Sequence, residues 1–386
     1  MLNKIDINLS VLFLLGAIIL NHTFFVTSYF LIFTKISFLV FIFFSFFYFI
    51  KFKENKILLF FIFTLLIISL GTPTIAWDAR SIWLLKAKII FYDQSFLNIM
   101  TKSPYFSNSN YPVIAPAFAA SFAQIVGYWN EIFPKAAFTL MFIPPLIILN
   151  KFFAKNFFLL IIIIILFIIG KYLINGEMDG LLSVYFATSA IMFYNLSDND
   201  KNYVNHLILI FLNIILSLIK IEGSILLFSL IIGCFVIFYK NKKIFKNIIL
   251  ISIFSFIPII VWNIFCAYTS LDNSISNNTF TTNNFYSRIF FLENYVIIFK
   301  YLLLNEKFLI SLLIMVLSLY FFQNNKILKM VFFTTFIYIF FLFLIYLSTS
   351  LNLEWHLNSA NRVIKPIALF FCIFSIYNIL IKKKKY

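Results

Sequence analysis

Apolar runs long enough to cross a membrane recur along the whole chain, and few charged residues interrupt them. A helix of about 20 apolar residues spans the roughly 30 Å hydrocarbon core of a bilayer. Such runs lie at residues 8–26, 29–50, 57–74, 136–150, 156–174, 180–196, 204–220, 223–239, 247–268, 296–321, 330–349 and 363–381. The sequence therefore predicts an all-α polytopic membrane protein with about twelve transmembrane helices, in which residues 1–386 form a single transmembrane domain. The run at 296–321 contains Glu306 and Lys307, so it is predicted as one span or as two shorter elements.

The composition excludes a water-soluble fold. Hydrophobic residues make up 63% of the 386 residues and charged residues only 11%, against roughly 45–50% and about 25% in a soluble globular domain. So few charged side chains cannot cover the surface of a soluble protein of this size. The three cysteines, Cys234, Cys266 and Cys372, lie in apolar runs without the spacing of a metal site, so we expect free buried thiols.

Basic residues concentrate in five connectors, at residues 51–56, 151–155, 240–246, 323–329 and 382–385. Cytoplasmic loops of membrane proteins carry an excess of Lys and Arg. Placing all five connectors on the cytoplasmic side makes the twelve spans alternate without conflict and leaves both termini cytoplasmic. The net charge of +16 is then mostly a topology signal. We therefore expect a lipid bilayer among the partners, and no nucleic acid.

Two sizeable loops are predicted on the outer side, at residues 72–135 and 269–295. Residues 111–128 within the first loop are apolar enough to enter the membrane, but both ends of this segment must lie outside. A re-entrant or juxtamembrane helix satisfies both conditions, and Pro112 and Pro116 suit a helix start.

Four short polar segments fall where predicted spans meet the outer face. They are residues 74–93 with Asp78, Arg80 and Lys86; 174–185 with Glu177 and Asp179; 220–224 with Lys220 and Glu222; and 353–366 with His356 and Arg362. Carboxylates at the bilayer edge are costly unless they are paired, face water or have a function. The four segments together predict a site for a lipid-linked substrate whose charged head lies at the outer interface.

Each of these residues also has a purely structural interpretation. Asp78 or Asp179 could cap the helix that follows it. Arg80 and the lysines after it could extend toward lipid phosphates from an amphipathic interfacial helix flanked by Trp77 and Trp83. Lys220 and Glu222 could form a local ion pair, since they share a very short turn.

The order of these motifs resembles the GT-C superfamily of polytopic glycosyltransferases, and specifically bacterial proteins related to glycosyltransferase family 39. The resemblance rests on the sequences WDARSIWLLKAK (77–88), NYPVIAPAF (110–118), GEMDGLLSVY (176–185), KIEG (220–223) and WHL-x-S-x-x-R-x-x-x-P (355–366). It covers most of the chain from about residue 70 onward. No single motif is specific, and the weight lies in their shared order and shared membrane side.

The resemblance implies inverting transfer of a hexose or pentose from a polyprenyl-phosphate donor to a glycan, lipid or protein acceptor. Transfer would take place at the outer face of a bacterial inner membrane. Asp78 is the candidate general base, and Arg80, Lys86 and Arg362 are candidate ligands of the donor phosphate. Asp179 would orient the acceptor or the base, or complete a divalent metal site. Further candidate site residues are Tyr111, Glu177, Lys220, Glu222 and His356.

Two other classes of function compete with this interpretation. A transporter or flippase of lipid-linked glycans predicts ionisable residues near the middle of spans, or broken helices in two related halves. A glycan polymerase or ligase predicts a large outer loop late in the chain. Here the ionisable residues gather at one face, and the longest outer loop comes early.

Overall fold

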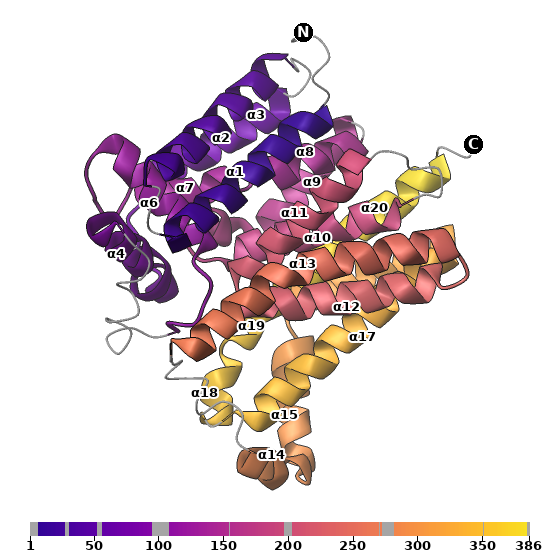
Figure 1. Cartoon of the computed structure of the whole chain (residues 1–386). Helices are drawn as coiled ribbons and strands as arrows, with labels where there is room; N and C mark the ends of the chain where they lie inside the picture. Colours follow the sequence, from indigo (N-terminus) through magenta and orange to yellow (C-terminus); the bar gives the residue numbers. More distant parts are fainter. Residues whose placement is uncertain are drawn as a thin grey trace.

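The computed structural model describes residues 7–27, 31–51, 56–94, 108–153, 155–196, 203–269, 271, 282–349 and 351–383. Within these ranges every regular element is a helix and no strand is present, so the predicted all-α class is confirmed (Figure 1). The elements are α1 Ile7–Thr27, α2 Leu31–Lys51, α3 Lys56–Gly71, the π-helix η3 Ala79–Leu84, α4 Leu85–Asp93, α6 Ile114–Val126, α7 Pro134–Leu140, α8 Ile143–Phe152, α9 Lys155–Ile169, the 3₁₀-helix η5 Gly170–Leu173, α10 Asp179–Tyr194, α11 Tyr203–Ile219, α12 Ile221–Phe238, α13 Lys242–Tyr268, α14 Thr282–Ile289, α15 Leu292–Leu303, α16 Glu306–Phe322, α17 Asn325–Ser348, α18 Leu353–Leu357, α19 Ala360–Val363 and α20 Lys365–Lys383. Residues 270 and 272–281 of the predicted outer loop 269–295, and residues 95–107 of the predicted outer loop 72–135, lie outside the described ranges.

Seven helical segments in the described residues are long and apolar enough to cross a membrane, and an eighth forms if the bent pair α15 and α16 is one span. Each of the twelve predicted spans overlaps a helix, but α1, α3 and α11 offer only shorter apolar stretches, and the 16-residue α10 belongs to neither group, so the count of twelve is not confirmed. The predicted run at 296–321 is two helices bent by 73°. The break has a local cause, because the side chain of Asn305 accepts a hydrogen bond from the Phe308 N–H and caps α16.

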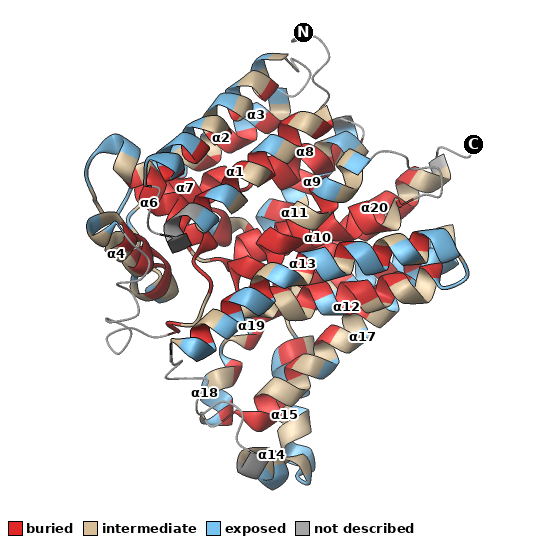
Figure 2. Cartoon of the chain, in the orientation of Figure 1, coloured by how far each residue is buried: buried red, intermediate tan, exposed pale blue. Residues whose placement is uncertain are grey.

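Buried residues concentrate in α10, α11 and α20, which lie at the centre of the bundle (Figure 2). Large apolar side chains are exposed along the outer faces of α2, α3, α13, α16 and α17. A soluble protein rarely exposes apolar surface on this scale, whereas a lipid bilayer covers it without cost. The cysteines Cys234, Cys266 and Cys372 are buried and free, as predicted.

Helix α6 occupies the predicted re-entrant segment 111–128, and it is packed inside the protein. It has 13 residues, and most of its side chains are buried against α1, α2, α4 and α7. Its small residues allow this close packing, and Asn21 of α1 donates a hydrogen bond of 2.6 Å to Ser121. Trp83 differs from its predicted place at the membrane interface, because its ring is buried whereas Trp77 is 62% exposed.

The basic connectors and the acidic segments lie at opposite ends of the bundle. Helix α10 begins at Asp179 and ends at Tyr194, and α12 begins beside Lys220 and ends shortly before Lys240. The 16 residues of α10 correspond to about 24 Å along the helix axis. We call the end that carries Asp179 the acidic end and the end that carries Lys240 the basic end. The start of α1 and the end of α20 lie on the side of the basic end, and α18 and α19 lie on the opposite side (Figure 1).

Helices α11 and α12 approach each other very closely where they meet at the acidic end. A Cβ atom added to Gly223 would lie 2.0 Å from the carbonyl oxygen of Leu216. Backbone atoms cannot move aside as a flexible side chain can. The glycine of the KIEG motif is therefore required by packing.

We predict that Gly223→Ala destabilises the protein by about 1–3 kcal/mol, because the added methyl group overpacks the α11–α12 junction. Thermal unfolding of the purified protein in detergent measures the change. The matched control is Gly71→Ala, since a Cβ at Gly71 would have no atom within 4 Å. Equal unfolding temperatures for the two variants would contradict the packing argument.

Candidate functional site

A guanidinium group joins two carboxylates from distant segments at the acidic end. Nη1 of Arg362, in α19, donates to Oδ2 of Asp78 and to Oε1 of Glu177, the latter at 2.9 Å. Asp78 lies directly before η3, and Glu177 lies in the turn between η5 and α10. The Arg362 side chain is 27% exposed, and the two carboxylates are less exposed than that. Three regions of the sequence therefore meet in one partly buried ion-pair cluster.

A lysine joins a second pair of carboxylates beside the first cluster. Nζ of Lys220 lies 3.3 Å from Oδ1 of Asp179 and 3.0 Å from Oε1 of Glu222. Lys220 is the single extended residue between α11 and α12. The local Lys220–Glu222 ion pair expected from the sequence is thus present, and Asp179 extends it across to α10. Asp179 also attracts Arg362 electrostatically, so the two clusters act on one another.

Neither Asp78 nor Asp179 caps a helix. Asp78 stands at the N-cap position of η3 without a side-chain capping hydrogen bond, and the N-cap residue of α10 is Met178. Both carboxylates are directed instead to cations from other segments of the chain, Arg362 in α19 and Lys220 at the α11–α12 junction. The turn after Asp78 is a π-helix, a form that occurs often at functional sites. These observations exclude the capping explanation for the two residues.

Gly176 brings the turn that carries Glu177 close to the turn that carries Asp78. Its φ angle is +86°, and a Cβ there would lie 3.0 Å from the Cβ of Ala79 and 3.3 Å from Cγ of Lys135. Only glycine adopts this backbone conformation readily. Asn175 then fixes the turn, because its side chain bonds both the Glu177 N–H and the Glu177 carboxylate.

Lys86 holds the loop in front of the acidic clusters. Its buried Nζ donates to the carbonyl oxygens of Asn108 at 2.8 Å, Ser109 at 3.3 Å and Tyr111 at 2.8 Å. A lysine ammonium has three donors, so all of them are used by the loop. Burial lowers the pKa of Lys86 to about 7. Lys86 is therefore not placed to reach a ligand as the loop stands.

Tyr111 belongs to this loop and lies within electrostatic reach of Glu222, Asp78 and Asp179. Its ring stacks on Trp83 with centroids 5.5 Å apart. Burial raises the pKa of its hydroxyl, and the nearby Glu222 carboxylate raises it further. The hydroxyl therefore stays protonated and can donate a hydrogen bond to a ligand.

Arg80 is separated from the other predicted phosphate ligands. It is exposed and lines a groove of about 510 Å³ together with Trp77, Lys88 and Glu131. Lys88 and Glu131 form an ion pair of 2.9 Å in this groove. The structure thus brings Arg362 into the acidic clusters, ties Lys86 to a loop and leaves Arg80 on another surface of the η3 turn.

Two buried polar atoms near the clusters have no hydrogen-bond partner among the described residues. They are Oε2 of Glu222 and Nδ1 of His356. The His356 ring packs against Tyr346 with centroids 4.9 Å apart, and Glu222 acts electrostatically on His356. Buried polar groups are usually satisfied, so this side of the cluster has unused capacity to bind a polar ligand.

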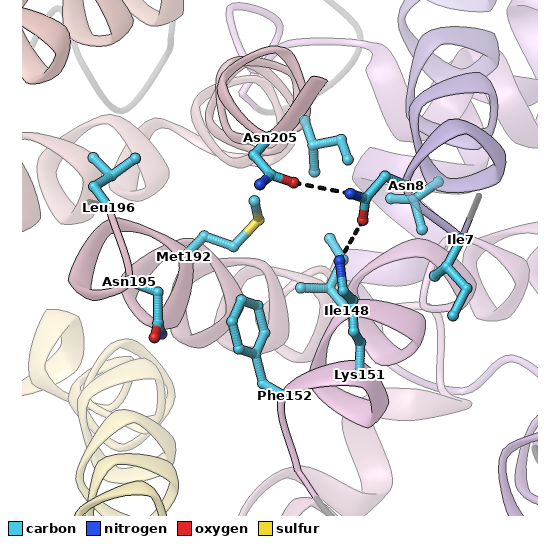
Figure 3. A pocket seen from close by; sticks show the side chains of 11 residues that line it. Ile7, Asn8, Ile148, Lys151, Phe152, Met192, Asn195, Leu196 and Asn205 are labelled. Carbon is cyan, nitrogen blue, oxygen red and sulfur yellow. Dashed lines mark hydrogen bonds between the residues drawn. The ribbon is translucent and has the colours of Figure 1, made fainter. Parts of the chain in front are cut away.

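A second polar cavity, of about 250 Å³, lies at the basic end (Figure 3). Asn8 accepts a hydrogen bond from Lys151 at 2.5 Å and donates one to Asn205 at 3.1 Å. The amide groups that line this cavity therefore bind groups of the protein itself. The cavity lies at the opposite end of the bundle from the acidic clusters. It supplies no titratable carboxylate among its lining residues.

Comparisons with protein-family models, with curated proteins and with solved structures find no match to this chain. The described residues contain no group of three or more His, Cys, Asp or Glu side chains arranged to hold a metal ion.

Sequence reasoning missed Tyr172 and the lysines Lys171, Lys307 and Lys365 around it. Nζ of Lys171 and Nζ of Lys365 lie 4.8 Å and 5.1 Å from the centroid of the Tyr172 ring. The signal available in the sequence was a lysine near the outer end of the runs 156–174 and 363–381, and a third lysine inside the run 296–321. Their proximity became visible only when α9, α16 and α20 were placed side by side.

We predict that Arg362→Gln lowers the free energy of unfolding by about 1–3 kcal/mol, because it leaves two partly buried carboxylates without their cation. Adding Asp78→Asn and Glu177→Gln to this variant should restore part of the loss. Unfolding in detergent measures both effects. The control is Lys88→Gln, which removes an exposed ion pair with Glu131 and should change stability by no more than about 0.5 kcal/mol. A loss in the control as large as that of Arg362→Gln would contradict the assigned pairing.

Proposed function

We propose that this chain is a membrane glycosyltransferase of the GT-C type. It transfers a sugar from a polyprenyl-phosphate donor to an acceptor hydroxyl, with inversion at the anomeric carbon. The reaction takes place at the acidic end, which we place on the outer face of a bacterial inner membrane. In this proposal the chain crosses the membrane about twelve times and both termini are cytoplasmic. In this proposal the short apolar helices, such as α1, α3 and α11, cross the membrane together with the residues that flank them at the membrane interface.

The observation that carries the proposal is how the four carboxylates at the acidic end differ in burial and in hydrogen bonding. Both oxygens of Glu177 accept hydrogen bonds, Asp179 is almost fully buried, and Oε2 of Glu222 is enclosed. Asp78 is 17% exposed and uses Oδ2 for Arg362. Its Oδ1 has no partner among the described residues and is not enclosed. Asp78 is therefore the carboxylate best placed to accept a proton from a ligand.

In the proposed reaction Oδ1 of Asp78 takes the proton of the acceptor hydroxyl. The hydroxyl oxygen attacks the anomeric carbon, the bond from that carbon to the phosphate oxygen breaks, and the bonding electrons leave with the phosphate. Arg362 orients Asp78 through Oδ2. A general base held in this way contributes about 10²–10⁴-fold to a rate.

The remaining residues have supporting roles in this proposal. Asp179 holds Lys220, and Lys220 in turn holds Glu222 beside the sugar. Lys86 keeps the Tyr111 loop over the site, so its phosphate role becomes indirect. Carboxylates outnumber cations in the two clusters. An excess of carboxylates suits the binding of sugar hydroxyl groups, which donate hydrogen bonds. In this proposal the anionic donor phosphate is bound beside the two clusters and not within them.

The lipid-linked glycan transporter and the glycan polymerase or ligase are the competing proposals. A transporter is less well supported because the paired charges lie at the end of α10, and not midway along it. A polymerase or ligase uses the same chemistry on a larger substrate, and differs in the acceptor. Transfer of sugar from a donor that carries one monosaccharide supports the proposed glycosyltransferase over both the transporter and the polymerase or ligase.

We predict that Asp78→Asn lowers sugar transfer by at least about 100-fold, because the amide cannot accept the proton. Membrane vesicles that contain the protein are supplied with labelled polyprenyl-phosphate sugar, and loss of label from the lipid fraction is measured. Glu131→Gln is the matched control, since Glu131 is an exposed carboxylate in the same predicted loop. Equal transfer by wild type and Asp78→Asn would show that the base is wrong. No transfer or donor binding by the wild type would contradict the proposed class.

We predict that a membrane-impermeant maleimide added outside cells labels Ile75→Cys and does not label Lys243→Cys. Ile75 is exposed near the acidic end, and Lys243 lies at the start of α13 at the basic end. The buried native cysteines should give little background. Labelling of Lys243→Cys from outside would reverse the proposed orientation and place the acidic end in the cytoplasm.

A further inference from the structure

Three lysines from three helical elements gather beside Tyr172 at the acidic end. Lys171 belongs to η5, Lys307 to the first turn of α16, and Lys365 is the first residue of α20. The ammonium groups of Lys171 and Lys365 both contact the Tyr172 ring, at 4.8 Å and 5.1 Å from its centroid. Such contacts are favourable because the ring face is electron-rich.

Lys307 is fixed in the same place by the end of α9. Its Nζ donates to the carbonyl oxygens of Phe167 at 2.5 Å and Ile168 at 3.4 Å. These carbonyls belong to the last turn of α9, the negative end of the helix dipole. Helix α20 packs against both α9 and α16, and η5 continues directly from α9. The packing of the helices therefore holds the three lysines together.

The three lysines have no carboxylate partner of their own. None of them forms an ion pair among the described residues, and Lys365 is repelled by both Lys171 and Lys307. Lys365 is only 4% exposed, and its side-chain hydrogen bond is a long one, 3.4 Å to Oδ1 of Asn361. The nearby carboxylates Glu177 and Asp179 are bound to Arg362 and Lys220. Like charges held together in this way favour the binding of an anion.

The surface beside the lysines is suited to a hydrocarbon chain. Phe167 lies under Lys307, with Nζ 5.3 Å from the ring centroid, and its side chain is 47% exposed. Ile163 and Leu166 on α9 are also exposed. The lysine cluster therefore sits at the end of an apolar helix face. That arrangement matches a molecule with a charged head and a long apolar tail.

We propose that Lys171, Lys307 and Lys365 bind the phosphate group of a membrane lipid, with Lys171 and Lys365 positioned by the Tyr172 ring. The lysines act as point charges on the phosphate oxygens, and the exposed face of α9 contacts the lipid chain. The same chemistry fits the phosphomonoester of a polyprenyl phosphate and the phosphodiester of an anionic phospholipid. The site requires no transfer reaction. If the proposed glycosyltransferase activity is correct, the polyprenyl phosphate would be its donor or product.

The test uses the full-length protein in phosphatidylcholine nanodiscs, with binding of labelled polyprenyl phosphate that carries no sugar. Lys171→Gln should weaken binding about fivefold, the effect expected for one basic residue near a lipid phosphate. Lys171→Gln combined with Lys365→Gln should weaken it by more. Lys307 is left unchanged because it caps α9. The matched control is Lys240→Gln, since Lys240 also lies over a tyrosine ring, that of Tyr239, at 5.6 Å but at the basic end.

A second set of nanodiscs contains phosphatidylglycerol as a competitor. Binding of polyprenyl phosphate that phosphatidylglycerol does not displace would identify the polyprenyl lipid as the ligand. Displacement at equal concentration would identify the anionic headgroup of the bilayer, and would equally support the site. Binding by Lys171→Gln and by the double variant that equals binding by Lys240→Gln would overturn the proposal. A wild type that binds the lipid but transfers no sugar would contradict the proposed function and leave the lysine site intact.

Discussion

Two cations that each bridge two carboxylates hold the acidic end of this bundle together. An unpaired charge at the edge of an apolar helix bundle is costly, so each carboxylate needs a cation within reach. Arg362 and Lys220 supply that contact to Asp78, Glu177, Asp179 and Glu222. These ion pairs join the turns that carry the residues, in addition to the packing of α10 against α11, α12 and η5. The ion pairs thus link η3, the turn before α10, the α11–α12 junction and α19 to one another.

The backbone is shaped to make these contacts possible. Gly176 allows its turn to lie against Ala79, and Gly223 allows α12 to begin against the carbonyl of Leu216. Lys86 fixes the loop in front of the clusters, and Trp262 of α13 donates a hydrogen bond of 2.8 Å to the Asn110 carbonyl in the same loop. These restraints come from helices on different sides of the bundle. The loop and the carboxylates are thus held in a defined relation before any ligand binds.

The helical class and the grouping of acidic residues could be predicted from sequence, because apolar runs and short connectors limit where polar residues can lie. Asp78 and Arg362 could be placed at the same end of the bundle, but their contact depends on three-dimensional packing across 284 positions of sequence. The directions in which the Lys86 and Arg80 side chains point depend on the π-helical turn η3, and no pattern of residues in the sequence predicts a π-helix there. The number of membrane spans could not be fixed from the sequence, because hydropathy does not distinguish a helix that crosses the membrane from a short buried helix such as α10 or α11. The lysine cluster was hidden because its members come from three distant runs.

The distribution of charge at the acidic end bears on the proposed chemistry on a lipid phosphate. Tyr172 contacts Lys171 and Lys365, and it also lies within electrostatic reach of Asp179 and Glu177. Tyr172 is therefore near both lysines without a carboxylate partner and carboxylates that are paired with Arg362 and Lys220. A glycosyl phosphate bound across it would have its phosphate near cations and its sugar near carboxylates. Transfer moves negative charge onto the departing phosphate and a proton onto the base, so both changes would be stabilised where they occur. An arrangement in which all cations surrounded Asp78 would instead weaken it as a base, which gives a physical reason for the two kinds of charge to be kept apart.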